Sequence, residues 1–209
     1  LSDGSRQVVH VTIAGSDDIP IDEKSDLYRN LLQALHDFGD PYQSIQLAVR
    51  KLILPIVAAK VRILPDYQWE SIEPQIRATL LDILGFERRE LGQSVWLSKV
   101  ISVIQQVQGV AYVDVDLFNS VSEEDIRTTG VTKKTRTLSI DGTKVTVQFD
   151  EEKNNLAIKL DGLPTESPLP LVTSSLAKID PEKRVIIPAQ LAILSPNVAD
   201  TIILTELKP

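Results

Sequence analysis

Three stretches of the chain repeat apolar residues at the spacing of one helical face. The first begins after Ser25, a good N-cap, and stops at Gly39, which favours the conformation that ends a helix. Its apolar positions are Leu27, Leu31, Leu35 and Phe38. The other two are Trp69–Gly85 and Ser98–Gln106. Their apolar positions are Ile72, Ile76, Leu80 and Ile83, and Leu97, Val100, Ile101 and Ile104. The sequence therefore predicts three amphipathic helices.

Four stretches alternate apolar and polar residues with the period of a β-strand. They are Val8–Ala14, Ile45–Ile53, Val57–Leu64 and Val110–Phe118. The middle two, joined near Pro55, are expected to form an antiparallel pair covered on one side. The order is then strand, helix, strand, strand, helix with a short helix, strand. It predicts an α+β fold with a ferredoxin-like (βαββαβ) antiparallel sheet and helices on one face.

The chain changes character after residue 118. Turn signals at Asp141-Gly142 and Asn154-Asn155 separate three short β-rich runs, which predicts a small all-β meander inserted into the fold. These runs are Thr135–Ile140, Thr143–Phe149 and Leu156–Leu160. The proline-spaced apolar tail is expected to be an extended C-terminal arm with a strand at Thr201–Leu207, docked on its own chain or on a partner. The predicted domains are 1–118, ferredoxin-like; 119–165, meander; and 166–209, proline-rich linker and docking arm.

Composition and charge narrow the possible functions. The 209 residues carry a formal charge of −7, which argues against a nucleic-acid partner, since phosphate binders usually present a basic face. No apolar run approaches the roughly 20 residues of a membrane helix, so no membrane span is expected. Cysteine is absent, which excludes disulfides and thiolate metal sites. Methionine is absent too and the chain opens with Leu1, so we expect a piece of a longer polypeptide.

Residues that could carry chemistry are few. Asp114 and Asp116 lie two apart on a predicted strand and could hold a divalent cation, but a solvated or interface role on the uncovered sheet face is favoured. His10 and His36 lie on different elements and form neither a zinc site nor a catalytic triad. No glycine-rich phosphate loop occurs. We therefore expect no catalytic residue, no cofactor and no metal.

A ferredoxin-like order also raises the possibility of an RNA-recognition module. Such a module stacks bases on aromatic residues of its central strands. The corresponding strands here offer His10, Thr12, Lys60 and Arg62 and no aromatic residue, so this interpretation is rejected.

Longer stretches of the chain resemble a known family. They are HVTIAGSDD, SDLYRNLLQALHDFGDP, KVRILPDYQWE, FERRELGQSVWLSKVISVIQQVQGVAYVDVD and IIPAQLAILSPNVADTIILTEL. Together they resemble the C-terminal part of a J-like baseplate wedge protein of contractile injection systems, the phage tails and related particles. The resemblance covers Gly4–Phe118 and Val185–Leu207 and is weak over Ser120–Ser175, which is expected to be a variable insertion.

The resemblance implies a structural component of the baseplate wedge and no enzymatic residues. Its implied partners are other wedge subunits, either own copies or a second J-like wedge protein, together with sheath-initiator and hub or spike proteins. Assembly would take place in the cytoplasm of the producing cell, in a virion or phage tail-like particle. The interface residues expected are Arg62, Tyr112, Asp114, Asp116, Phe118, Leu191, Leu194, Ile202 and Leu204. The alternatives are a metal-dependent enzyme using Asp114 and Asp116, and a carbohydrate- or receptor-binding module on the meander.

Overall fold

The computed structural model describes residues 8–123, 134–140, 143–150, 155–161, 168–196, 198 and 201–208. Within these residues the chain is a mixed α+β protein with three α-helices and several separate sheets, which confirms the predicted α+β class. The predicted division at residues 118 and 165 stays a prediction.

The first element is a parallel strand–helix–strand unit, which we call the N-terminal unit. Strand β1 (Val8–Ile13) pairs in parallel with β2 (Ser44–Val49), with Val11 opposite Leu47, and α1 (Asp26–Phe38) connects them after the short 3-10 turn η1 (Ser16–Asp18). The Ser25 hydroxyl accepts a hydrogen bond from the Tyr28 N–H, which confirms the predicted N-cap. These two strands form a sheet of their own, so the expected antiparallel pairing of residues 45–53 with 57–64 is wrong.

Strand β3 (Lys51–Ile63) has 13 residues and continues straight through Pro55 rather than breaking there as expected. The Lys51 N–H donates to the Ala189 carbonyl and the Ile53 carbonyl accepts from Ile193, so alternate residues of β3 direct their backbone groups at the C-terminal arm. Pro55 is the next residue in that series. Arm pairing stops at Ile53 and resumes at Val57, so the missing N–H of proline falls where the arm has left the strand.

The central sheet is built around β3. Strand β5 (Val110–Ser122) pairs antiparallel with one edge, and β12 (Gln190–Ala192) and β13 (Ile202–Glu206) pair in parallel, one after the other, with the opposite edge. Ferredoxin-like topology is therefore not confirmed: β1 and β2 lie in another sheet, and arm strands take their place beside β3. The reason is that β3 continues through Pro55, so no hairpin brings residues 45–49 back onto β3, and the arm strands pair with this edge instead.

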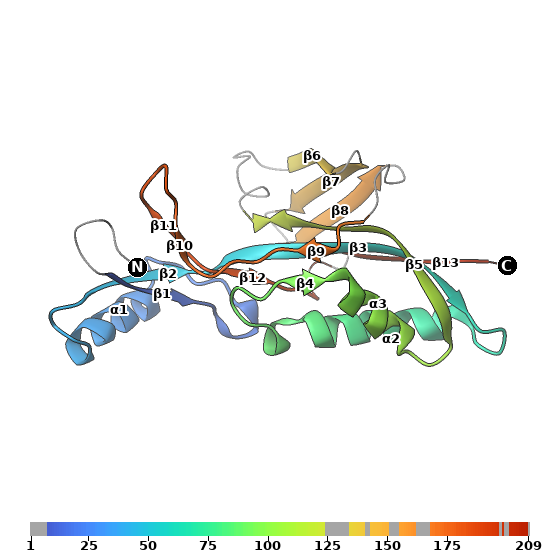
Figure 1. Cartoon of the computed structure of the whole chain (residues 1–209), viewed down its shortest axis with the longest axis horizontal. Coiled ribbons are helices and arrows are strands. Elements are labelled where there is room, and N and C mark those ends of the chain that lie inside the picture. The colour runs from blue at the N-terminus through green and yellow to red at the C-terminus, as the bar shows by residue number, and fades with distance from the viewer. Residues whose placement is uncertain are drawn as a thin grey trace.

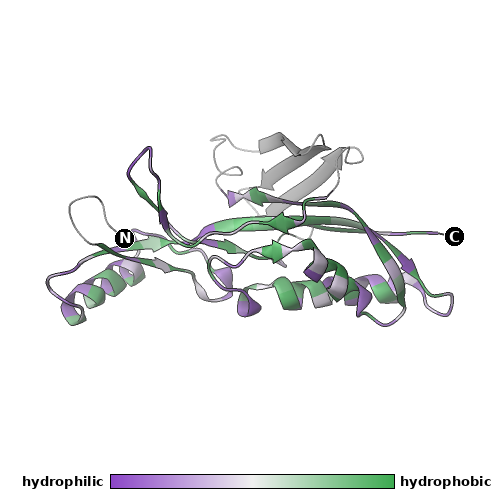
Figure 2. Ribbon diagram, viewed as in Figure 1, coloured by the Kyte–Doolittle hydropathy of each residue, from purple (hydrophilic) through white to green (hydrophobic). Residues whose placement is uncertain are grey.

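Two helices cover one face of the central sheet and form the main core with it (Figure 1). Helix α2 (Trp69–Leu84) buries Ile72, Ile76, Leu80 and Leu84, so its predicted stripe is confirmed except that Leu84 replaces Ile83. Helix α3 (Leu97–Gln105) buries Val100, Val103 and Ile104. Figure 2 shows hydrophobic stretches, in green, on these two helices and along β3. Between the helices lie η2 (Phe86–Arg88) and β4 (Val95–Trp96), which pairs antiparallel with β9 (Leu171–Val172).

The opposite face of the sheet is covered as well. Residues Ile53–Ala59 of β3 are buried without a break, and Leu54, Ile56 and Leu117 are almost completely buried. On that side lies the antiparallel meander of β6 (Lys134–Ile140), β7 (Thr143–Asp150) and β8 (Asn155–Asp161) (Figure 1). The three predicted meander strands are thus confirmed, whereas the Asp141-Gly142 turn lies outside the described residues. Burial on both faces explains the nearly continuous apolar run of β3.

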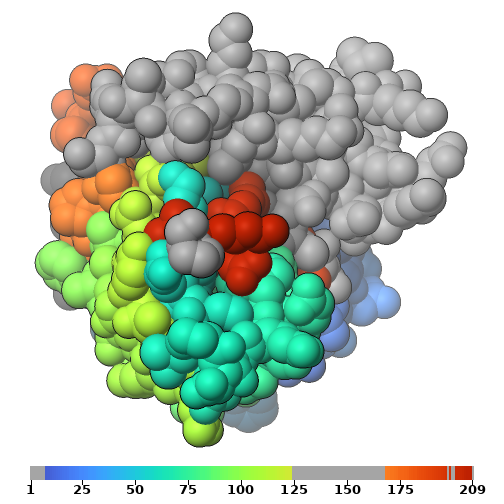
Figure 3. All heavy atoms as spheres, turned by 90° about the vertical axis from the view of Figure 1, so that its right-hand side faces the viewer, coloured from blue at the N-terminus to red at the C-terminus, as the bar shows by residue number. Residues whose placement is uncertain are grey.

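The C-terminal arm docks on its own chain, one of the two outcomes expected from the sequence. It first forms a projecting hairpin of β10 (Lys178–Ile179) and β11 (Ile186–Ile187), then follows the β3 edge through β12 and β13. The observed β13 lies within the predicted strand Thr201–Leu207. Figure 3 shows the last arm residues, in red, at the surface of one end of the molecule, beside the end of β3 and the start of α2.

Candidate functional site

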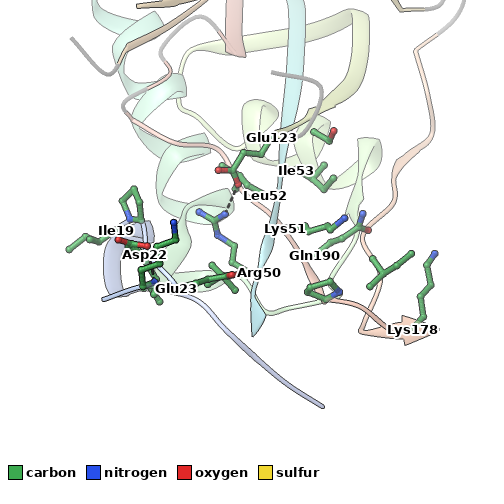
Figure 4. A pocket seen from close by; sticks show the side chains of 18 residues that line it. Ile19, Asp22, Glu23, Arg50, Lys51, Leu52, Ile53, Glu123, Lys178 and Gln190 are labelled. Carbon is green, nitrogen blue, oxygen red and sulfur yellow. Dashed lines mark hydrogen bonds and ion pairs between the residues drawn. The ribbon is translucent and has the colours of Figure 1, made fainter. Parts of the chain in front are cut away.

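A groove of about 1220 Å³ separates the N-terminal unit from the central sheet. The loop 15–24, the β2–β3 junction, the end of β5 and the base of the β10–β11 hairpin line it. Charged side chains of both signs face it: Asp22 and Glu23 lie on one side and Lys51 and Lys178 on the other (Figure 4). These residues do not form a catalytic constellation of nucleophile and base. The groove is instead the seam between two structural units.

Arg50 lies at the floor of this seam with its side chain only 9% exposed. Its Nε donates to Asp18 Oδ1 at 2.8 Å, and an ion pair with the same carboxylate forms through Nη2. Its Nη1 donates to Glu123 Oε2 at 3.0 Å, the contact drawn in Figure 4. Asp18 belongs to the loop after β1, and Glu123 follows the last residue of β5. One guanidinium therefore connects the N-terminal unit to the central sheet; we call this set of three residues the Arg50 clasp.

The loop that supplies Asp18 has a strained backbone. Asp17 and Asp18 have φ angles of 52° and 59°. In this left-handed conformation, residues other than glycine have a higher backbone energy. Burial raises the pKa of the Asp18 carboxyl, and the charge of Arg50 opposes this rise. A strained, buried carboxylate is held in place here because it completes the coordination of Arg50.

Helix α1 presents an apolar surface to solvent. Leu27, Leu31 and Phe38, three members of its predicted core stripe, are 66%, 37% and 91% exposed; we call them the α1 outer stripe. The helix instead rests on β1 and β2 through a neighbouring set of half-buried residues that includes Tyr28 and Leu32, and the Tyr28 hydroxyl donates to the Leu47 carbonyl. The apolar face predicted for this helix is therefore only partly covered, because the sheet beneath it has two strands.

The α1 outer stripe continues into a neighbouring hollow. Leu27 and Leu31 line a space of about 900 Å³ together with Ile19 and Ile21 of the preceding loop. Ile19 is itself 63% exposed. Contiguous exposed apolar residues of this kind mark contact surfaces in proteins, whereas single exposed apolar residues do not. Helix α2 differs, because the four residues that it buries, beginning with Ile72, lie on its inner face.

The aspartate pair Asp114 and Asp116 is brought to Lys60 of β3. Lys60 Nζ donates to Asp116 Oδ1 at 2.8 Å, and Lys60 is the register partner of Asp114. The hydrogen bond and charge of Asp116, with a smaller contribution from Asp114, raise the pKa of Lys60. A fixed ammonium group thus stands where a cation would be bound. In the part of the chain that the structure describes, no cluster of three or more potential ligands could hold a metal.

The predicted interface residues separate into two groups. Phe118, Leu191, Leu194 and Ile202 are buried at 3% exposure or less inside the chain's own core, so in this fold they offer no accessible surface. Leu204 is half-buried against the same core. Arg62, Tyr112, Asp114 and Asp116 remain at least partly accessible on β3 and β5, with Tyr112 43% exposed. An interface at these accessible residues stays a prediction.

The two histidines lie on different elements, β1 and α1. His36 is exposed near the end of α1. His10 lies on β1, and neither of its ring nitrogens, both shielded from solvent, has a hydrogen-bond partner. Burial lowers the pKa of His10, so its neutral form is favoured. This is the behaviour of a structural histidine.

A comparison with protein families gives a match at the N-terminal unit. Residues 1–48 match the Baseplate J-like central domain. The match spans β1, α1 and β2 as far as Ala48, and so includes the α1 outer stripe. It supports a baseplate J-like protein; it describes a central domain, not the C-terminal part that the sequence resemblance implied. A comparison with curated proteins found no match. No helix in the described residues is long and apolar enough to cross a membrane.

Sequence reasoning missed the Arg50 clasp and the exposed stripe. Local patterns could not pair these three residues, because Asp18 and Glu123 lie 32 and 73 positions from Arg50 along the chain. The one available signal was the position of Arg50 between two apolar runs. Which of two overlapping apolar stripes α1 would bury could not be read from periodicity alone.

Proposed function

We propose that this chain is a structural component of the baseplate wedge of a contractile injection system or phage-like tail. In this role it joins neighbouring baseplate subunits around the central hub and helps couple triggering to sheath contraction. The family match to residues 1–48 supports a baseplate role in general, and the wedge position and coupling go beyond that match.

The α1 outer stripe carries this proposal. Leu27, Leu31 and Phe38 lie within the matched segment and are exposed, and Leu27 and Leu31 also line an apolar hollow. Leaving such a surface in water is unfavourable, so a chain that keeps it has a use for it in an assembly. The parallel pair β1–β2 adds to this argument, since neither of its outer edges is paired with another described strand.

The proposed partners are other baseplate components: own copies or a second J-like wedge protein, with sheath-initiator and hub or spike proteins as further neighbours. The accessible residues Arg62, Tyr112 and Asp114 on the central sheet are a second proposed contact. Assembly is proposed to occur in the cytoplasm of the producing cell. The chain is proposed to have no catalytic activity.

The two alternatives have less support. A metal-dependent enzyme using Asp114 and Asp116 would have to displace the ammonium group of Lys60, which already bonds Asp116 at 2.8 Å. A carbohydrate- or receptor-binding role would rest on the side chains of residues 134–161, and none of the described contacts supports it.

Site-directed cross-linking tests the proposal cleanly because the chain contains no cysteine. A single cysteine at Asn30, exposed on α1, would be linked by a short bifunctional reagent inside the assembled particle, and the partner identified by mass spectrometry. The expected product joins α1 to another baseplate subunit. A cysteine at Ala78, exposed on α2, serves as the comparison. Failure of the Asn30→Cys variant to cross-link in intact particles, while its cysteine reacts freely with a monofunctional thiol reagent, would contradict the proposal.

A further inference from the structure

The connection between the N-terminal unit and the central sheet consists of one residue. Strand β2 ends at Val49 and β3 begins at Lys51, so Arg50 alone separates two strands that belong to different sheets. The Arg50 N–H still donates to Ile13 of β1 at 2.8 Å, whereas the Lys51 N–H already donates to Ala189 of the arm at 3.0 Å. The backbone therefore changes partner sheets at this position, which is where a hinge would act.

The side chain of the same residue joins the two sides of that hinge. It reaches Asp18 in the N-terminal unit and Glu123 at the end of β5. A second hydrogen bond that spans the seam is donated by the Ala189 N–H to the Thr12 hydroxyl at 3.1 Å. A groove of about 1220 Å³ opens along part of the seam, while η1 also lies against η2.

We infer that Arg50 is both hinge and clasp: its ion pairs with Asp18 and Glu123 hold the N-terminal unit at one orientation to the central sheet, and breaking them allows that unit to swing. The inference goes beyond the proposed function and does not depend on it, since it concerns the movement of one chain. Two observations favour a movable connection over an ion-pair cluster that only stabilises the fold. The carboxylate of Asp18 is presented from a left-handed backbone, and all three charges converge on the residue where the sheets change.

Distance measurement between spin labels tests this directly in the full chain. Cysteines replacing Asn30 on α1 and Ala78 on α2 would carry the two labels, with no native cysteine to interfere. The parent protein is expected to give one narrow distance distribution. Arg50→Met and Glu123→Gln are each expected to broaden or shift it at a temperature well below the unfolding midpoint of each variant. Glu123→Gln keeps the shape of the side chain, so it remains informative if Arg50→Met fails to fold.

The matched control breaks an ion pair that spans no seam. Arg88 and Asp82 form an ion pair at 3.0 Å, and their side chains are 61% and 59% exposed. Asp82→Asn should leave the distance distribution unchanged. A narrow, unshifted distribution in folded Arg50→Met or Glu123→Gln protein would overturn the inference. So would equal broadening in Asp82→Asn, because the effect would then not be specific to the clasp.

Discussion

Replacing Phe38 by serine should damage assembly and leave folding intact. The Phe38 side chain is 91% exposed, so the chain itself buries only about a tenth of it. Complete burial of a phenylalanine is worth about 1.5–3 kcal/mol, and serine and phenylalanine have similar helix propensities. The free energy of unfolding should therefore change by less than about 0.5 kcal/mol. If a neighbour covers Phe38, the variant loses about 1.5–3 kcal/mol per contact, a 10- to 150-fold weaker association.

Two measurements separate these effects. Urea denaturation of the variant gives its stability, and reconstitution of baseplates from a dilution series of subunits, counted by electron microscopy, gives its assembly. Phe38→Leu should assemble nearly normally, since it keeps an apolar side chain. Ile76→Ala, at a position with 0% exposure, should lose about 2–5 kcal/mol of stability and shows that the denaturation assay responds. Assembly of Phe38→Ser at parental efficiency across the dilution series would refute the reasoning.

Three further predictions concern single residues. Burial lowers the pKa of His10, so the unfolded chain binds a proton at this residue more readily than the folded chain. The free energy of unfolding should therefore fall as the pH drops below about 6.5. Urea titrations should show a weaker fall in His10→Gln, and equal falls would contradict this. Gly109→Ala should cost about 1–3 kcal/mol in the same assay, since φ is +99° and the new Cβ would lie 2.7 Å from a carbon of Tyr67; an unchanged midpoint would be the contrary result. Manganese should not raise the melting temperature, because Lys60 already neutralises Asp116, and a rise that Asp114→Asn abolishes would favour the enzyme alternative.

Local sequence patterns predicted the helices and strands well, but they did not predict which strands pair with each other. The observed α1 begins after Ser25 and ends at Phe38 as expected, although Gly39 is extended, with φ −85°, and not left-handed. The alternation of β5 was misread at one position, because Asp116 is the extra residue of a β-bulge: Ala59 lies opposite Val115 and Ala58 opposite Leu117. The bulge reverses the alternation and brings Phe118 into the main core, opposite Val57. No residue pattern within the strand indicates a bulge at this position.

The sheet arrangement could not be predicted because it depends on whether the chain turns at Pro55. The chain does not turn at Pro55, so residues 51–53 belong to β3 itself, and the edge of β3 is paired by β12 and β13. Similarly, the exposed and buried sets of α1 overlap on the helix, and only the width of the sheet beneath decides between them. The candidate contact surface was thus hidden in a correctly predicted helix, since its apolar residues were assigned to a core.

The docking of the arm along β3 has a consequence for how the protein is made. Val57 pairs with Ile202, which leaves the ribosome about 145 positions later. Until then, the buried run Ile53–Ala59 has an unpaired strand edge, the feature that recruits other chains into aggregates. Pairings between such distant segments also form slowly. A chain interrupted before β13 would keep this edge open, so the central sheet can close only after synthesis has passed residue 206.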